Sequence, residues 1–237
     1  LKNIHYLKQV LIKEIIKFLN GSQYLKDLRS LELEGNEIKD ITVLSELKKL
    51  ERLNLNQNEI RDITSLSGLN NLKELDLNSN KIRNISSLDK LSSLNILKLM
   101  GNNIKKIDNI SKLDNLTVLQ IGNNNLDNIK PISKLNNLIK LDLYMTKTKK
   151  INCLSNLKEL KKLNLTGNKI EDINVLESLD KLKELDIRWN DLKDISVLLK
   201  LDNLKELTIG KSDKYAKSDQ GKKVISKLKN RGVKIKY

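Results

Sequence analysis

The chain has 237 residues and a formal net charge of +15, and only 3% of its residues are aromatic, so Leu and Ile must supply any core. Cys153 is the only cysteine, which excludes an intramolecular disulfide and a cysteine-rich zinc site. No run of 18 or more apolar residues is present, so we expect no transmembrane segment.

Residues 1–19 predict an amphipathic helix, because apolar side chains fall along one stripe: Ile4, Leu7, Leu11, Ile15 and Phe18. Lysines interrupt this stretch, which argues against a signal peptide. A solenoid exposes its core at each end unless it is capped. We therefore expect residues 1–24 to form a helical N-terminal cap.

Residues 25–212 predict a repeat of 22 residues. Apolar residues fall at positions 1, 4, 7, 9, 14, 17 and 20 of each unit, and Asn falls at position 12. Self-similarity at a fixed period of this length is the signature of a solenoid. Eight full units and the beginning of a ninth open on leucines: Leu25, Leu47, Leu69, Leu91, Leu113, Leu135, Leu157, Leu179 and Leu201.

The spacing within each unit predicts its local structure. Positions 7 and 9 alternate with polar neighbours, which is typical of a short strand with one buried face. From position 14 onward apolar residues recur every third residue, which favours a 3₁₀ or extended path over an α-helix. The predicted fold is an α/β solenoid, a right-handed superhelix with a concave parallel β-sheet and a thin convex side.

The Asn column predicts a ladder of buried amides. An inward Asn at a turn can bond backbone groups of its own and neighbouring units. Thr146 in the sixth unit and Ser212 in the ninth depart from the pattern, and Thr148 replaces the usual Ile or Leu. We expect either a local irregularity around Thr146 or a tolerated substitution. The column consists of Asn36, Asn58, Asn80, Asn102, Asn124, Asn168 and Asn190.

Over roughly residues 25–212 this pattern resembles the 22-residue class of leucine-rich repeats found in bacterial internalins and SDS22-like proteins. The resemblance implies a protein-binding scaffold, at the cell surface or secreted if internalin-like, and cytoplasmic if the chain is complete as shown. The Lys, Asn and Ile bias indicates an AT-rich, bacterial genome. Pairs at positions 16 and 17 look internalin-like: Asp40-Ile41, Asp62-Ile63, Asp172-Ile173 and Asp194-Ile195.

Residues 213–237 predict a C-terminal cap. Ser218 can cap a helix that runs to about Asn230, with Gly232 as its stop signal. Apolar residues mark the inner face of this helix and a final strand: Val224, Ile225, Leu228, Val233, Ile235 and Tyr237. With a cap at each end, we expect one complete structural domain.

The location of the charge decides what the net +15 means. Residues 1–24 carry +3 and residues 211–237 carry +8, which leaves +4 for residues 25–210. The predicted concave positions 6, 8, 10, 11 and 13 sum to −3 over the nine units. A face that follows a phosphate backbone would be basic, so we expect no nucleic acid there. The basic C-terminal residues form either an anion-binding patch or a solvated face: Lys222, Lys223, Lys227, Lys229, Arg231, Lys234 and Lys236.

The predicted concave face changes character along the chain. Units one to three place polar, mainly acidic residues on it, whereas later units place large side chains there. Trp, Tyr and Arg dominate interface energetics, and Met adapts to irregular partners. The predicted partner-binding residues are Ile96, Met100, Val118, Tyr144, Met145, Arg188 and Trp189.

Catalytic chemistry is not predicted. His5 is the only histidine and lies in the predicted cap, so neither a histidine-based triad nor a histidine-rich metal site can form. No phosphate-binding or dinucleotide-binding glycine pattern is present. We therefore expect a monomeric protein–protein interaction module without catalytic residues, metal or cofactor. The alternative is association with an anion, a nucleic acid or a membrane surface through the basic caps.

Overall fold

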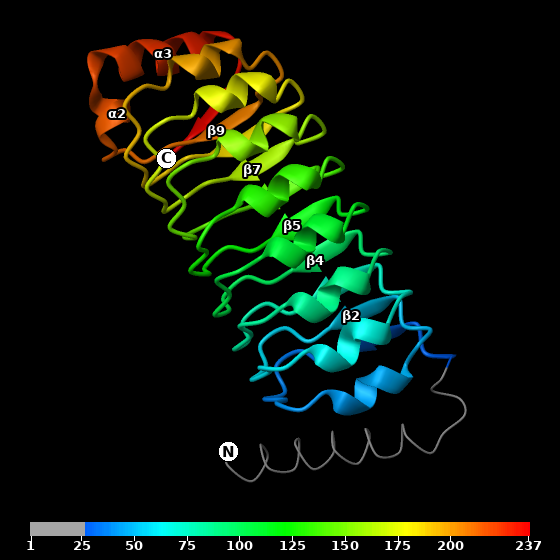
Figure 1. The fold of residues 1–237 in the computed structure, drawn as a ribbon. Helices are drawn as coiled ribbons and strands as arrows, with labels where there is room; N and C mark the ends of the chain where they lie inside the picture. Colours follow the sequence, from blue (N-terminus) through cyan, green and yellow to red (C-terminus); the bar gives the residue numbers. More distant parts are fainter. Residues whose placement is uncertain (1–26) are drawn as a thin grey trace.

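The computed structural model describes residues 27–237, in which ten strands form one parallel sheet in sequence order (Figure 1). The predicted helix of residues 1–19 lies outside this range. The strands are β1 Ser30–Glu32, β2 Arg52–Asn54, β3 Glu74–Asp76, β4 Ile96–Lys98, β5 Val118–Gln120, β6 Lys140–Asp142, β7 Lys162–Asn164, β8 Glu184–Asp186, β9 Glu206–Thr208 and β10 Lys234–Lys236.

The first nine strands repeat one register. Leu53 in β2 pairs with Leu31 in β1 and with Leu75 in β3, so equivalent positions of successive units stand side by side. Position 7 points into the core, while positions 6 and 8 face outward and remain half-buried or exposed. The alternation seen in the sequence therefore corresponds to a sheet with one buried face.

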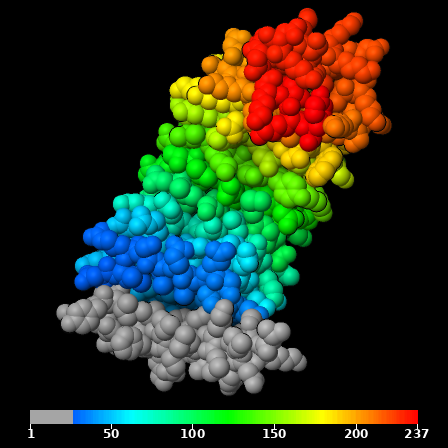
Figure 2. Space-filling view, turned by 180° about the vertical axis from the view of Figure 1, so that it is seen from behind, coloured from blue at the N-terminus to red at the C-terminus, as the bar shows by residue number. Residues whose placement is uncertain are grey.

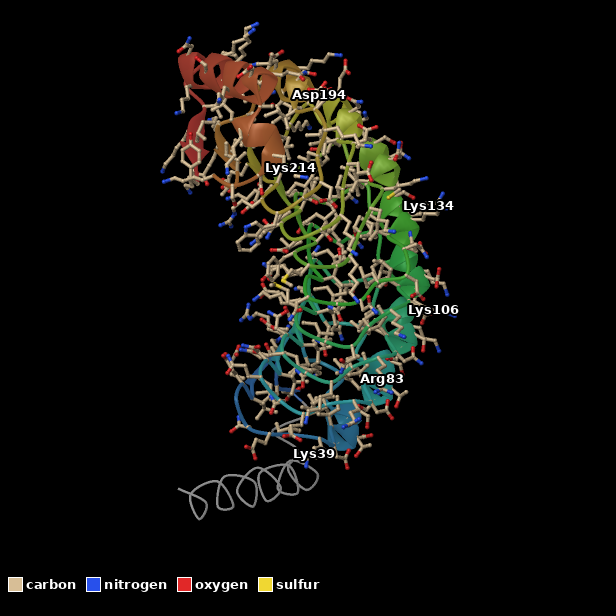
Figure 3. The ribbon with its side chains drawn as sticks, turned by 90° about the vertical axis from the view of Figure 1, so that its left-hand side faces the viewer. Lys39, Arg83, Lys106, Lys134, Asp194 and Lys214 are labelled. Carbon is tan, nitrogen blue, oxygen red and sulfur yellow. The ribbon has the colours of Figure 1, made fainter. Side chains whose placement is uncertain are left out.

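Short 3₁₀ helices form the opposite wall, on the outer side of the curve (Figure 3). Each is five residues long and places the apolar residue of position 20, such as Leu66, in the core. The predicted solenoid with a concave sheet and thin convex side is confirmed. The helices are η2 Thr42–Glu46, η3 Thr64–Gly68, η4 Ser86–Lys90, η5 Asp108–Lys112, η6 Lys130–Lys134, η7 Asn152–Asn156, η8 Asn174–Ser178 and η9 Ser196–Lys200.

The Asn ladder is present as predicted. In the third unit, Asn80 Nδ2 donates to the Leu55 carbonyl of the preceding unit (2.9 Å) and to the Leu77 carbonyl of its own (3.1 Å). Its Oδ1 accepts from the Ile60 amide (3.0 Å). Each central Asn therefore joins two units through backbone groups that would otherwise be buried without partners.

The sixth unit departs locally from the ladder, which is one of the two outcomes that its threonines left open. Thr146 Oγ1 donates to the Leu143 carbonyl (3.1 Å) and lies 2.8 Å from Thr148 Oγ1, so two buried hydroxyls replace the amide. Lys147 lies between the two threonines at position 13 and has a left-handed backbone with φ 63°. Among the position-13 residues of the described range 27–237, only Glu37 has the same conformation.

The ninth unit closes on a carboxylate, whereas the preceding units other than the sixth use an amide. Asp213 Oδ2 accepts from the Gly210 amide (3.0 Å), the Trp189 amide (3.2 Å) and the Tyr215 hydroxyl (2.7 Å). Asp213 and Tyr215 are both buried. Burial and the adjacent carboxylate raise the pKa of Tyr215 well above its ordinary value, so its hydroxyl remains a donor.

The C-terminal cap contains helices α2 Lys214–Lys217 and α3 Asp219–Asn230, followed by β10. Ser218 Oγ accepts from the Gly221 amide (3.0 Å) and caps α3 as predicted, and Gly232 ends it at φ 83°. The tail adds β10 beside β9 in parallel, also as predicted. The short α2 was not predicted. Within residues 27–237 no helix has the length and apolarity needed to cross a bilayer.

Candidate binding surface on the concave face

The side chains predicted to form the concave surface come from β4, β5 and the turns that follow β4, β6 and β8. Ile96 and Val118 are register partners at the starts of β4 and β5, and both are half-buried. Met100 follows β4 and is also half-buried. Figure 2 shows the molecule from behind, on the side opposite the 3₁₀ helices, where the units follow one another in chain order.

Met145 and Trp189 are exposed large apolar side chains. Trp189 retains 57% of its accessible surface and Met145 retains 45%, whereas Tyr144 and Arg188 are half-buried. The ring is therefore available to a partner.

Position 11 of each of the first eight units has a left-handed backbone. Trp189 (φ 55°) and Met145 (φ 50°) adopt this conformation, which costs a non-glycine residue about 1–2 kcal/mol. Glycine or asparagine suits the position better, so packing and backbone preference do not explain these two side chains. The other units place smaller or polar residues there: Gly35, Gln57, Ser79, Gly101, Asn123 and Gly167.

Arg188 holds the indole of Trp189 in place. Its Nε lies 3.0 Å from Asp186 Oδ1 and its Nη2 lies 2.7 Å from Asp186 Oδ2, which fixes the guanidinium plane. The guanidinium carbon lies 5.6 Å from the centroid of the Trp189 ring, within the range of a cation–π contact. Asp186 also raises the pKa of Arg188. The fixed guanidinium thus lies against one side of the exposed indole ring.

Met145 depends on a small neighbour in the next unit. A Cβ added to Gly167 would lie only 2.7 Å from Met145 Cγ, so the methionine side chain occupies the space that the glycine leaves. The small residue at position 11 of the seventh unit therefore makes room for the large one of the sixth unit on this rim.

The floor of the sheet over β6–β9 carries mixed charge. A shallow depression of about 240 Å³ crosses these strands, and Lys162 in β7 pairs with Glu184 in β8 (2.7 Å). Its lining holds two lysines and four acidic residues: Lys140, Lys162, Asp142, Glu184, Asp186 and Glu206. This balance fits a polar protein surface better than a phosphate backbone.

Two leucine-rich-repeat families match segments of the chain. The family described as Leucine Rich repeats (2 copies) matches residues 26–69 and 48–90, and the family described as Leucine Rich repeat matches residues 157–173 and 178–198. No curated protein sequence matches the chain at a comparable level of significance.

Solved structures of internalins are similar over most of the chain. Internalin C2 from Listeria monocytogenes is 32% identical with a TM-score of 0.77, and the match covers 78% of this chain and 82% of that one. This protein is an internalin-like leucine-rich-repeat protein. The internalin InlF from the same organism is 35% identical with a TM-score of 0.77, and the match covers 78% of this chain but 55% of InlF, so the chain spans about half of that relative.

A more distant likeness extends to plants. The ectodomain of the receptor kinase GASSHO1/SCHENGEN3 from Arabidopsis thaliana, solved in complex with CASPARIAN STRIP INTEGRITY FACTOR 2, is 24% identical with a TM-score of 0.65. The match covers 78% of this chain and 24% of the receptor. At this identity the likeness shows the shared fold alone.

The internalin-like protein also exposes an apolar residue that sequence reasoning missed. Ile139, at position 5 of the sixth unit, retains 37% of its accessible surface. Position 5 holds polar residues in the units before and after it, such as Thr117 and Lys161. An isoleucine among polar residues at position 5 could have indicated an exposed apolar side chain. Position 5 was not among the positions assigned to the concave face.

Reactive groups do not converge in the described part of the internalin-like protein. Cys153 is half-buried, its Sγ lies 3.6 Å from the Ile129 carbonyl oxygen, and burial raises the pKa of its thiol. His5 lies outside the described residues. Among residues 27–237, no three His, Cys, Asp or Glu side chains are placed to hold a metal ion.

Part of the basic C-terminal patch is structural. Arg231 Nη2 donates to the Leu201 carbonyl (2.8 Å), Lys236 pairs with Glu206, and Lys222 lies 3.8 Å from Asp219. The contacts of Arg231 and Lys236 join the cap to the ninth unit, and Lys222 pairs within α3, so fewer cations are available for an anionic surface.

Proposed function

We propose that this internalin-like protein binds a protein partner through the concave side of repeats four to eight. The observation that carries the proposal is Trp189, a large exposed ring on a left-handed backbone where glycine or asparagine would cost less. Met145 repeats the same departure two units earlier. Leucine-rich repeats are common protein-interaction modules, and proteins of the internalin-like class typically act as non-enzymatic binding scaffolds.

The residue types favour a protein over other partners. Trp, Tyr and Arg carry most of the binding energy in protein interfaces, and a flexible Met fills irregular gaps. The concave positions sum to −3 over the nine units and to only +2 over repeats four to eight, so this face lacks the charge that a phosphate backbone needs. Ile96, Val118 and Met100 extend the apolar contact towards the middle of the sheet. With no converging reactive groups in residues 27–237, we propose binding without catalysis.

Replacing Trp189 with glycine tests the contribution of the ring to binding without disturbing the fold. The change removes the ring and relieves the left-handed backbone, so we expect the free energy of unfolding to change by less than about 1 kcal/mol. Partner affinity should fall roughly tenfold to a hundredfold, as for other buried interface anchors. Affinity is measured with a purified partner first captured by the wild-type protein, and stability is measured by thermal unfolding.

Lys134→Ala provides the control, because Lys134 is exposed at the end of η6 on the convex side (Figure 3). It should bind the partner as well as the wild type does. Equal affinity of wild type and Trp189→Gly, with both folded, would refute the concave anchor.

A further inference from the structure

The flank that leads from the sheet to the 3₁₀ helices contains a long groove. Two adjoining depressions of about 990 and 1270 Å³ run along units three to eight and share Asp127 and Lys147 in their lining. Figure 3 looks along this flank, with Arg83 and Lys106 labelled beside the row of 3₁₀ helices. We call this feature the flank groove, and it borders the concave face, with which it shares residues of positions 11 and 13, including Asn123, Met145 and Lys147.

The flank groove coincides with the two units that lack a regular element of the repeat. In six units the side chain at position 16 is Asp or Asn, and its Oδ1 accepts from the backbone amide two residues later, as Asp62 does from Thr64 (2.9 Å). The other five are Asp40, Asn84, Asn128, Asp172 and Asp194. Units four and six have Lys106 and Lys150 instead, and lysine has no acceptor for that amide.

The two lysines at position 16 add positive charge to the flank groove. Lys106 and Lys150 stand two units apart, roughly 10 Å by the spacing of parallel strands. Within residues 27–237 no salt bridge joins either of them to an acidic side chain. The groove lining as a whole has eight cations, Arg83, Lys105, Lys106, Lys130, Lys147, Lys149, Lys150 and Lys169, against five acids, Asp108, Asp127, Glu171, Asp172 and Asp191.

The acidic residues are unevenly placed along the groove. Glu171, Asp172 and Asp191 line its C-terminal end, where Glu171 pairs with Lys193. Around units four to six, Asp108 and Asp127 face six of the cations. The middle of the groove is therefore the basic part, and it is there that the two position-16 residues are lysines.

The rest of the lining indicates what kind of anion fits. Exposed amides of Asn103, Asn123 and Asn125 offer both donors and acceptors, which suit hydroxyl groups. No aromatic side chain lines the groove within the described residues, so bases have no stacking platform. Met145 is the one exposed apolar residue of the lining, which offers little to an apolar peptide.

We propose that the flank groove is a second binding site, which takes an anionic polysaccharide carrying sulfate or phosphate groups. Lysines of units four to six contact the anionic groups, and the asparagine amides contact the sugar hydroxyls. The proposal does not depend on the concave anchor, because Lys106 and Lys150 lie at position 16, outside the concave positions, and can be replaced without changing Trp189.

The test uses the double variant Lys106→Asn, Lys150→Asn, which removes two charges and supplies the capping group that Asn84 and Asn128 already provide. Binding of heparin, a sulfated probe, should weaken roughly tenfold or more, and the dependence of log affinity on log salt should lose a slope of about two. The variant should unfold at the same temperature as the wild type or higher, because the cap hydrogen bonds are restored. Desulfated heparin should bind weakly to both.

Two further variants test whether heparin binds in the flank groove or elsewhere on the protein. Lys223→Gln, Lys227→Gln removes the same charge from α3 and should retain heparin binding, as should Trp189→Gly. Failure of the wild type to bind heparin would overturn the proposal, and so would equal losses in the flank and α3 double variants. Tighter binding of single-stranded RNA than of heparin, lost in the flank variant, would assign the groove to a nucleic acid instead.

Discussion

Gly221→Ala is expected to destabilise the C-terminal cap by about 3 kcal/mol or more, although alanine is ordinarily the better helix former by about 1 kcal/mol. A Cβ at this position would lie 1.7 Å from the Tyr215 carbonyl oxygen, because the first turn of α3 packs directly on the end of α2. Backbone cannot yield as a flexible side chain can, so α3 must shift away from Ser218 and the ninth unit.

Hydrogen exchange can locate this loss. The bonds that join β10 to the ninth unit, such as Lys234 N–H to the Lys205 carbonyl (2.8 Å), should lose protection first. Lys223→Ala is the matched control, since it adds no atoms and lies on the exposed side of α3. Retention of wild-type protection in the Gly221→Ala protein would contradict the packing described for α2 and α3. An uncapped last unit should also aggregate more readily.

The second large effect is expected at Asn102. Its Nδ2 donates to the Leu77 carbonyl (2.9 Å) and to the Leu99 carbonyl (3.0 Å), and its Oδ1 accepts from the Ile82 amide (3.0 Å). Asn102→Ala removes the hydrogen-bond partner of three buried backbone groups in two units. Each of these groups that finds no replacement partner costs about 1–3 kcal/mol of stability. We expect a total loss of about 3 kcal/mol in the free energy of unfolding, measured by urea denaturation.

Asn103→Ala is the control for this change, because the adjacent side chain is exposed. It should alter stability by less than about 0.5 kcal/mol. Similar losses in the two variants would show that the ladder contributes little beyond general packing. Since each unit contacts only its neighbours, the loss of protection should centre on units three to five.

Much of the fold follows from a pattern that each unit repeats. The leucine of position 7 and the Asn of position 12 recur at a step of 22 residues, so the neighbour of Leu53 or Asn80 was predictable without coordinates. Ser218 and Gly232 set the ends of α3 by local backbone chemistry alone. The concave placement of Trp189 also followed from the repeat, and its partner-binding role stays a prediction.

The turn conformations and side-chain contacts at the exceptions to the repeat had to be seen in three dimensions. The left-handed backbone of Met145 and Trp189, the fixing of Arg188 by Asp186, and the closure of the ninth unit on Asp213 all depend on rotamers and turn geometry. The flank groove likewise appears only when units four to six are stacked. The period, the buried positions and the main helix and final strand of the C-terminal cap are local or strictly repeated features, so the sequence was sufficient to predict them. Which exceptions to the repeat lie next to one another is visible only in the folded chain, because side chains 22 or 44 residues apart become neighbours through stacking.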